Sequence, residues 1–462
     1  MNEISDIINA DGLDRTLADV TSELLYVYDN TLANNAEKRS YYDGSATVCD
    51  LGINVVPDSV EVSVSCDWAR KAVTSVTERS KFIGFIDANG ERNEMLDAIM
   101  LDSRLKSRFT RSLNGELVHG CMCATVGRSG NAAAVRFHSA ESSAMIYDVG
   151  NDRLASGFVI ADRKRMPWSM NKAVPTQVNM HLPGRVVEFK RDAQTRWTAR
   201  DYRTPLDVPM MIAFAYNADD DQPLGHSRVS KYVRDISDEF MRVFEYMSVS
   251  GALNAAPQKF LLGLTEENFK AFAKDKRGHY IGSWVLTTLD EEGNKPDIGQ
   301  LPQHSPQPYI DTLRLLATLL SGATGVPINS LGIIQDNPSS AQAITAARED
   351  ICVITDNMND ANGESLRDVA LMAMAVANNQ TVDELPLAVR AAEAKFDPPL
   401  YRSLAETCDA AMKLASVAPG YASTLDFWES VGKSDAEAAG ILSDLERLSA
   451  LEMLDSMTGT DK

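Results

Sequence analysis

The hydrophobic positions of the chain alternate between stretches with helical spacing and one long stretch typical of strands. In the first forty residues apolar side chains recur every three or four positions, which predicts helices. From Val60 the pattern predicts a short strand, followed by a helix from Trp68 to about Arg79. Residues 116–217 contain β-rich runs separated by Gly, Asn and Asp, which predicts an antiparallel β region. The expected strands are 116–125, 134–137, 157–161, 177–182 and 185–189.

Two long amphipathic helices bracket a small insert in the second half of the chain. One apolar stripe predicts a helix over residues 227–254, which Pro257 ends. A Ser-Pro pair at 305 and 306 predicts the start of the second helix, whose stripe continues to Gly322. Residues 257–305 mix strand-like and helical patterns, so they predict a small α+β unit between the helices.

A loop with turn residues and several apolar side chains follows the second helix. It covers residues 326–338 and contains the apolar pair Ile333 and Ile334. Two interpretations remain open: the loop folds onto its own core, or it is a mobile element that presents side chains to a ligand or an axial channel. A capping-box pattern at Ser339 then predicts another long helix, and the tail from Leu387 is predicted to be an acidic helical domain.

Composition and charge narrow the class of protein. The 462-residue chain is 44% hydrophobic and 24% charged, an ordinary globular composition whose length predicts about three structural units. A net charge of −20 argues against a protein that grips nucleic acid through clustered cations. The acidic N-terminus is unlike a signal peptide, and the longest apolar run, 369–377, is too short for a membrane span. The six scattered cysteines are expected to be reduced core residues of a cytoplasmic protein.

Candidates for catalysis or metal binding are few. His119, Cys121 and Cys123 would share one face of a strand, but their spacing is poor for zinc, and a buried strand face is the favoured interpretation. The sequence has no phosphate-binding glycine loop, nucleophile elbow or paired-histidine zinc motif, so we predict no catalytic residue, metal or cofactor. The acidic runs 219–221 and 290–292 leave one enzymatic alternative, a metal-dependent nuclease or hydrolase, although such runs are usually solvated.

Four stretches occur in an order that is typical of one family. They are Tyr41-Tyr42-Asp43-Gly44; the run from Trp68 to Phe85 with Glu78-Arg79 and Ile83-Gly84-Phe85; Pro223 to Val229 leading to Ala256-Pro257-Gln258-Lys259; and Ala323 to Pro327, continuing through Leu331-Gly332 to Asn337-Pro338-Ser339-Ser340-Ala341. On these stretches the chain resembles the portal proteins of tailed bacteriophages, in particular the branch of the portal of phage SPP1.

The resemblance implies an α+β portal architecture with a mixed α/β wing, a long helical stem, a small α+β clip and a C-terminal helical crown. The implied parts are the wing at 1–225 and 339–378, the stem helices at 226–256 and 306–325, the clip at 257–305, the tunnel loop at 326–338 and the crown at 379–462. The implied channel residues of the tunnel loop are Ile328, Asn329, Ser330, Ile333, Ile334, Gln335, Asp336 and Asn337. Stem cations that would face the channel or a neighbour are Arg228, Lys231, Arg234 and Arg242, and clip candidates for motor or adaptor contact are Lys274, Lys276 and Arg277.

The resemblance also implies a structural, non-enzymatic function. The chain would form a dodecameric ring at a capsid vertex, through which double-stranded DNA is packaged and ejected without being read. Its partners would be the terminase large subunit, a head-to-tail adaptor, and the major capsid or scaffolding protein, in the virion and, during assembly, in the host cytoplasm. Twelve copies would carry a charge of about −240, which suits a conduit to which DNA does not stick. A capsid or tail component without a channel remains the structural alternative.

Overall fold

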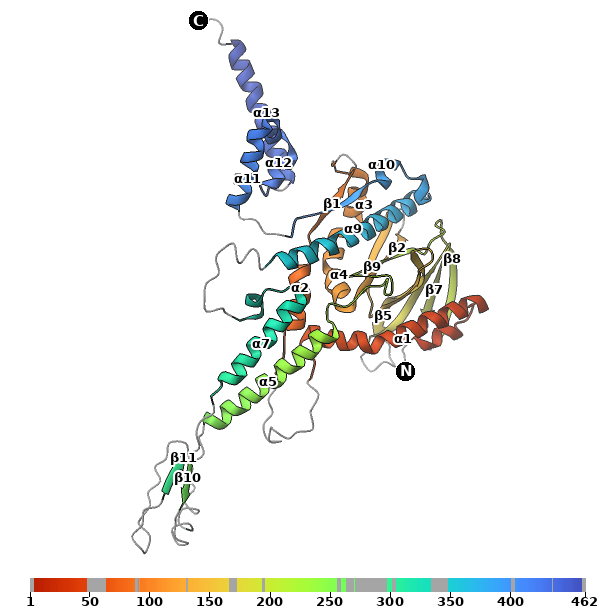
Figure 1. Ribbon diagram of the computed structural model, residues 1–462. Helices are drawn as coiled ribbons and strands as arrows, with labels where there is room; N and C mark the ends of the chain where they lie inside the picture. The colour runs from red at the N-terminus through yellow and green to blue at the C-terminus, as the bar shows by residue number, and fades with distance from the viewer. Residues whose placement is uncertain are drawn as a thin grey trace. The chain divides into compact units, whose positions relative to one another are not determined.

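The computed structural model in Figure 1 divides the chain into two compact units, Met1–Pro399 and Leu400–Lys462. The structure describes residues 4–47, 64–87, 90, 92–129, 132–165, 173–192, 196–255, 259–262, 270, 297–300, 305–333, 348–399, 404–433 and 435–458. Helices and antiparallel sheets both contribute, so the predicted α+β class is confirmed.

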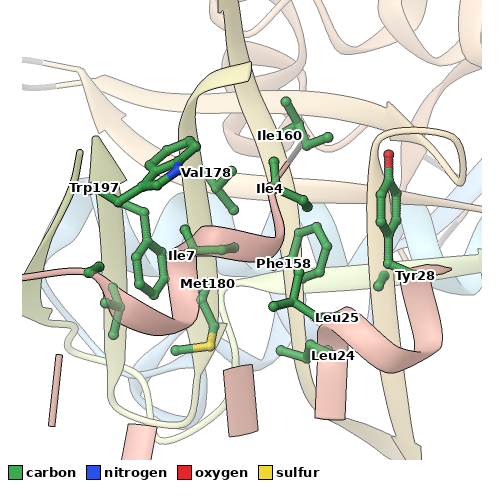
Figure 2. Packing of buried hydrophobic residues seen from close by; sticks show 14 of the residues in the cluster. Ile4, Ile7, Leu24, Leu25, Tyr28, Phe158, Ile160, Val178, Met180 and Trp197 are labelled. Carbon is green, nitrogen blue, oxygen red and sulfur yellow. The ribbon is translucent and has the colours of Figure 1, made fainter. Parts of the chain in front are cut away.

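A five-stranded antiparallel sheet forms one part of the first unit. Its strands, in spatial order, are β4 (Ser143–Asp148), β5 (Arg153–Arg165), β6 (Ala173–Leu182), β7 (Arg185–Arg191) and β8 (Trp197–Arg203). The 3₁₀ helix η1 (Ser5–Asn9) and the long helix α1 (Arg15–Asp43) cover one face. Figure 2 shows Ile7, Leu24 and Tyr28 from these helices packed on Phe158 and Met180 of the sheet.

The middle of strand β5, residues 157–160, is apolar because both faces of the strand are buried there. Phe158 and Ile160 point into the core shared with α1 (Figure 2), whereas Val159 packs with Met145 and Met211 on the other side. The sheet is therefore covered on both faces around the middle of β5, whereas β8 is mostly exposed.

A second, three-stranded sheet connects this region to the helices. Its order is β3 (Ala132–Ser139), β2 (Cys121–Ser129) and β9 (Met211–Ala215), and it packs against α4 (Leu105–His119) and α9 (Glu349–Asn378). Residues 369–376 of α9 are all buried, so the longest apolar run of the sequence is a core helix. Among the described residues, no helix is long and apolar enough to cross a membrane.

Several short elements complete the first unit. They are α2 (Trp68–Thr77), β1 (Phe82–Ile86), α3 (Glu94–Asp102), η4 (Val382–Glu384), α10 (Leu387–Arg390) and β12 (Glu393–Phe396). Strand β12 pairs antiparallel with β1, and Phe82, Phe109 and Phe396 form one aromatic cluster with centroids 5.6 to 6.2 Å apart. This pairing joins segments that lie about three hundred residues apart in the sequence.

A helical pair extends from the first unit, as the sequence predicts. Helix α5 (Lys231–Ala255) packs along α7 (Gln307–Thr324), and β10 (Lys259–Leu262) pairs with β11 (Asp297–Gln300) at the far end of the helices (Figure 1). After α7, Gly325 with φ +68° ends the helix and η3 (Ile328–Leu331) follows. The second unit contains α11 (Leu404–Val417), η5 (Pro419–Ser423), α12 (Leu425–Ser430) and α13 (Asp435–Thr458).

Three sequence-based predictions are corrected. Residues 116–119 are the end of α4 and not a strand, because Leu105, Phe109, Leu113 and Leu117 form a buried helical stripe that Gly120 ends at φ +100°. Helix α5 begins at Lys231 and not at residue 227, since the preceding backbone is bonded to other segments: the Arg228 N–H donates to the Leu117 carbonyl. Residues 379–399, grouped with the crown in the sequence, have their contacts in the first unit.

Other predictions fall on residues outside those the structure describes. These are most of the short strand predicted from Val60, the capping box at Ser339, the acidic run 290–292, and most of the insert, including Lys274, Lys276 and Arg277.

Candidate functional site

The base of the helical pair is the point where the segment 223–229 meets the two sheets. Gly225 has φ +79°, and a Cβ atom there would lie 2.5 Å from the Tyr216 carbonyl oxygen and 2.6 Å from that of Gly120. Only glycine permits this approach. The Ser227 hydroxyl donates to the Val118 carbonyl at 2.5 Å, which fastens the entry of α5 to the end of α4.

Arg228 connects four segments at this base. Its guanidinium donates to the carbonyl oxygens of Ala72 in α2 and Thr324 at the end of α7, and to the Tyr216 hydroxyl at 2.9 Å. The residue is only 9% exposed. The N–H groups of a guanidinium point in fixed directions within one plane. Hydrogen bonds from Arg228 to three acceptors therefore hold α5 and α7 in position relative to α2.

The other three predicted cations lie along α5 and are paired within the same chain. Lys231 is exposed and lies 2.6 Å from Asp235. Arg234 lies 3.3 Å from Glu37 of α1, and Arg242 lies 2.7 Å from Glu239. These pairs describe one copy, so the predicted contacts of the cations with DNA or with a neighbouring copy stay predictions.

Helix α5 is also fixed to α1 and α2 by polar and aromatic contacts. The Tyr41 hydroxyl donates to Asp238 at 2.7 Å, and burial together with this carboxylate raises the pKa of Tyr41. The rings of Trp68 and Phe240 lie 4.3 Å apart. Tyr41 and Trp68, which belong to the first two of the four portal-like stretches, thus fix α5 to α1 and α2.

The helical pair carries large apolar side chains that are exposed to solvent in a single copy of the chain. They are Tyr232 and Phe244 on α5, and Leu315 and Leu319 on α7. Leu315 is 58% exposed and Leu319 is 44% exposed. Leu315 and Leu319 lie four positions apart, so they share one exposed face of α7. This arrangement favours a further protein surface against the pair.

The segment after α7 contains half of the predicted channel residues. Ile328 and Ile333 are half-buried, Asn329 and Ser330 are exposed, and Leu331 is buried among them. The first turn of the loop is therefore folded onto the protein while presenting polar side chains outward. Ile334, Gln335, Asp336 and Asn337 lie outside the described residues.

The structure separates the three residues with metal-binding side chains. His119 ends α4, whereas Cys121 and Cys123 lie in β2, and burial raises the pKa of both thiols to about 12. The His119 Nε2 atom lies 3.5 Å from the Glu141 carboxylate. This contact with His119 lowers the pKa of Glu141. Across the described parts of the chain, no group of three His, Cys, Asp or Glu side chains is placed to hold a metal ion.

The acidic run 219–221 forms a turn. Asp219 accepts hydrogen bonds from the backbone N–H groups of Asp221 and Gln222 and interacts with His226 Nε2 at 2.8 Å. The His226 hydrogen bond, followed by that of Gln222, lowers the pKa of Asp219. The carboxylate oxygens of Asp219 thus stabilise the turn that leads to Gly225. This gives Asp219 a structural role.

Sequence reasoning missed one buried carboxyl. Glu116 in α4 is fully buried, and Asn362 in α9 donates to it at 3.0 Å. Burial raises its pKa to about 8. The signal was present in the sequence, because Glu116 lies on the same helical face as Leu113 and Leu117 once residues 105–119 are recognised as a helix.

Comparison with known proteins gives one sequence relative. No family model matches the chain. The portal protein of Mycobacterium phage L5 is 21% identical over 413 residues, which are 86% of this chain and 81% of the phage protein.

Solved structures from gene transfer agent (GTA) particles are weakly similar. A chain of the "Neck of empty GTA particle computed with C6 symmetry" has a TM-score of 0.48 and 13% identity, and the match covers 76% of this chain and 86% of that one. A chain of the "Neck of native GTA particle computed with C12 symmetry" has a TM-score of 0.45 and 13% identity, with 79% and 90% covered. The resemblance predicted from the four stretches is therefore confirmed as sequence similarity to a portal protein, and the phage SPP1 branch stays a prediction.

Proposed function

We propose that this chain is the portal protein of a tailed bacteriophage, of the branch that includes the portal of phage SPP1. Copies of it form a closed ring at one capsid vertex, and double-stranded DNA passes through the ring during packaging and ejection. The observation that carries the proposal is the similarity to the phage L5 portal protein over 413 residues. That span includes most of the elements at the base of the helical pair.

The exposed apolar side chains of the helical pair support the ring. Tyr232, Phe244, Leu315 and Leu319 would be covered by the equivalent helices of the next copy. Head-to-tail contacts of this kind close into a ring when the rotation between copies permits it. The helices would then line a channel, with η3 close to the end of α7.

The remaining parts of the proposal concern partners. The insert between α5 and α7 is the part we assign to contact with the terminase large subunit and later with the head-to-tail adaptor. A major capsid or scaffolding protein would contact the ring from the capsid side. The function is structural, in the virion and during assembly in the host cytoplasm, and the engaged carboxylate of Asp219 speaks against the nuclease alternative.

Electron microscopy and mass photometry of the purified full-length chain test this proposal. Twelve copies of 50.5 kDa predict a ring of about 600 kDa with a central channel. A closed assembly without a channel would favour the structural alternative, another capsid or tail component. A species that stays monomeric or dimeric at every concentration would contradict the proposal.

A further inference from the structure

An acidic pocket opens in the first unit at the start of strand β5. It has a volume of about 730 Å³ and lies between the turn from β4 to β5, the loop before β9, α9 and η4. Each of these four walls contributes one aspartate to the lining; in chain order they are Asp152, Asp207, Asp368 and Asp383. The volume falls within the range of ~300–1,000 Å³ that is typical of ligand sites.

The pocket combines accessible carboxylates with an apolar lining. All four aspartates are exposed. Leu154, Met211 and Leu371, which also line the pocket, are buried in the core of the unit. An occupant that matches both features carries positive charge and apolar surface in the same molecule.

The protein itself neutralises these carboxylates weakly. Asp368 lies 3.5 Å from Arg367, and Asp383 lies 3.7 Å from Arg390. Such solvent-exposed pairs contribute little stability. Asp207 forms no ion pair with any residue that the structure describes. A cationic ligand would therefore find carboxylates that it can engage at little cost.

The side chains of the lining offer more acceptors than donors. Two of its hydroxyl groups already donate within the protein, that of Tyr147 to Asp152 at 2.7 Å and that of Ser365 to a backbone carbonyl at 3.0 Å. Arg153 and Thr381 carry the remaining side-chain donors of the lining. A peptide brings a carbonyl acceptor with nearly every N–H donor, whereas an ammonium group brings donors alone. The lining thus favours an occupant that consists of donors and apolar groups.

The spread of the aspartates over four walls favours an extended cation. In the described ranges of the chain, no three His, Cys, Asp or Glu side chains are placed to hold one metal ion. Several positive groups joined by apolar segments can reach carboxylates on separate walls, which a single ion does not.

We propose that this pocket binds an aliphatic polyamine of the spermidine type. The ammonium groups of the ligand would bind the aspartates, and its methylene groups would lie on Leu154, Met211 and Leu371. The binding needs only one copy of the chain. It goes beyond the proposed function and does not depend on ring formation.

Isothermal titration calorimetry of the full-length chain with spermidine tests the site. We expect one spermidine to bind per chain. Asp207→Asn with Asp368→Asn should weaken this binding about tenfold or more, because two charge-assisted contacts are lost. Circular dichroism checks that the variant is folded. Binding that is unchanged in the folded variant would overturn the inference.

A matched control separates the pocket from the general attraction of an acidic protein for cations. Asp19→Asn with Asp102→Asn removes the same charge at exposed positions of α1 and α3 that do not line the pocket. We expect its spermidine affinity to equal that of the wild type. An equal loss of affinity in both double variants would mean diffuse binding to a chain of net charge −20 and would overturn the inference.

A ligand series on the wild-type chain tests the apolar lining without any substitution. Ethylenediamine and diaminooctane carry the same charge, and the longer diamine should bind about tenfold or more tightly because its methylene groups leave water. Equal affinities would overturn the inference. A blocked peptide of alternating lysine and leucine that bound more tightly than spermidine would assign the pocket to a protein segment and reject the polyamine. Mass photometry reports ring formation separately, so each proposal can fail without the other.

Discussion

Arg228 shows how one buried cation can determine the direction of a pair of helices. Its guanidinium serves acceptors on α2, α7 and Tyr216, and lysine offers donors around a single nitrogen that cannot reach all three. We therefore expect Arg228→Lys to destabilise the first unit by about 2–4 kcal/mol through unpaired buried acceptors. Urea denaturation followed by circular dichroism measures the change.

An exposed cation of the same helix provides the control for Arg228. Lys231→Ala removes an ion pair with Asp235 in which the lysine side chain is 80% exposed. We expect a change of roughly 0.5 kcal/mol or less, since solvent screens such pairs. If the two variants had similar unfolding midpoints, Arg228 would have no special role at the base of the helices.

Glu116 makes stability depend on pH. Its folded pKa of about 8 lies above the ordinary value of 4.5, so the folded state holds a proton that the unfolded state releases as pH rises. The penalty for burying the carboxyl therefore grows from about pH 4.5 to pH 8. Glu116→Gln should raise the melting temperature at pH 8 and change it little at pH 5.

The matched control for Glu116 lies on the exposed surface of α3. Glu94→Gln alters the charge by the same amount without burial. Its melting temperature should differ from the wild type equally at both pH values. A Glu116→Gln variant without a pH-dependent gain would mean that the carboxyl is ionised in the folded protein at pH 5.

Elements with a strong helical stripe could be predicted from the sequence. The spacing in α1, α2, α5 and α7 reports the face that each helix buries, and caps such as Gly44 and Gly325 mark helix ends. Residues 116–119 were misassigned because a short apolar run before β2 fits a helix and a buried strand equally well. Strand β12 has only four residues, and its pairing with β1 depends on tertiary contacts.

The candidate site was predictable only where it is local in sequence. The stretch 223–229 stood out, and its glycine and arginine prove to hold the base of the helices. The burial of Arg228 was not predictable, because its acceptors lie on segments that the fold alone brings together.

Helix α5 depends on the apolar surface that it buries. Val243 is 7% exposed, so Val243→Asp would place a charge in an apolar contact without a partner. We expect loss of folding or of ring formation, seen by circular dichroism and electron microscopy. Val243→Ala, which only removes two methyl groups, should lower stability by about 1–3 kcal/mol and leave the rings intact. An aspartate variant that assembles normally would show that this face is not buried.

The segment that follows η3 gives a functional prediction. If residues 333–337 act at the channel and not in the core, their deletion should leave ring assembly intact and stop DNA packaging. Micrographs of the purified variant and counts of DNA-filled heads measure the two effects separately. Replacing the exposed pair Asn329 and Ser330 with alanine is the comparison within the same loop. Failure of the deletion variant to assemble would assign the segment to the core.

At the scale of the whole molecule, the boundary between the two units has consequences for truncation. The first unit includes β12, whose Phe396 lies opposite Phe82 in the pair with β1. A chain that ends at Pro399 keeps this pair, and we expect it to unfold at nearly the same urea concentration as the first unit of the full chain. A chain that ends at Ala391 loses β12 and uncovers Phe82 and Phe109, whose rings both contact Phe396. Removing such aromatic burial should cost about 3–5 kcal/mol, so the shorter chain should unfold at clearly lower urea or aggregate. If the two truncated chains were equally stable, residues 392–399 would contribute nothing to the first unit, and the sequence-based grouping with the C-terminal part would stand.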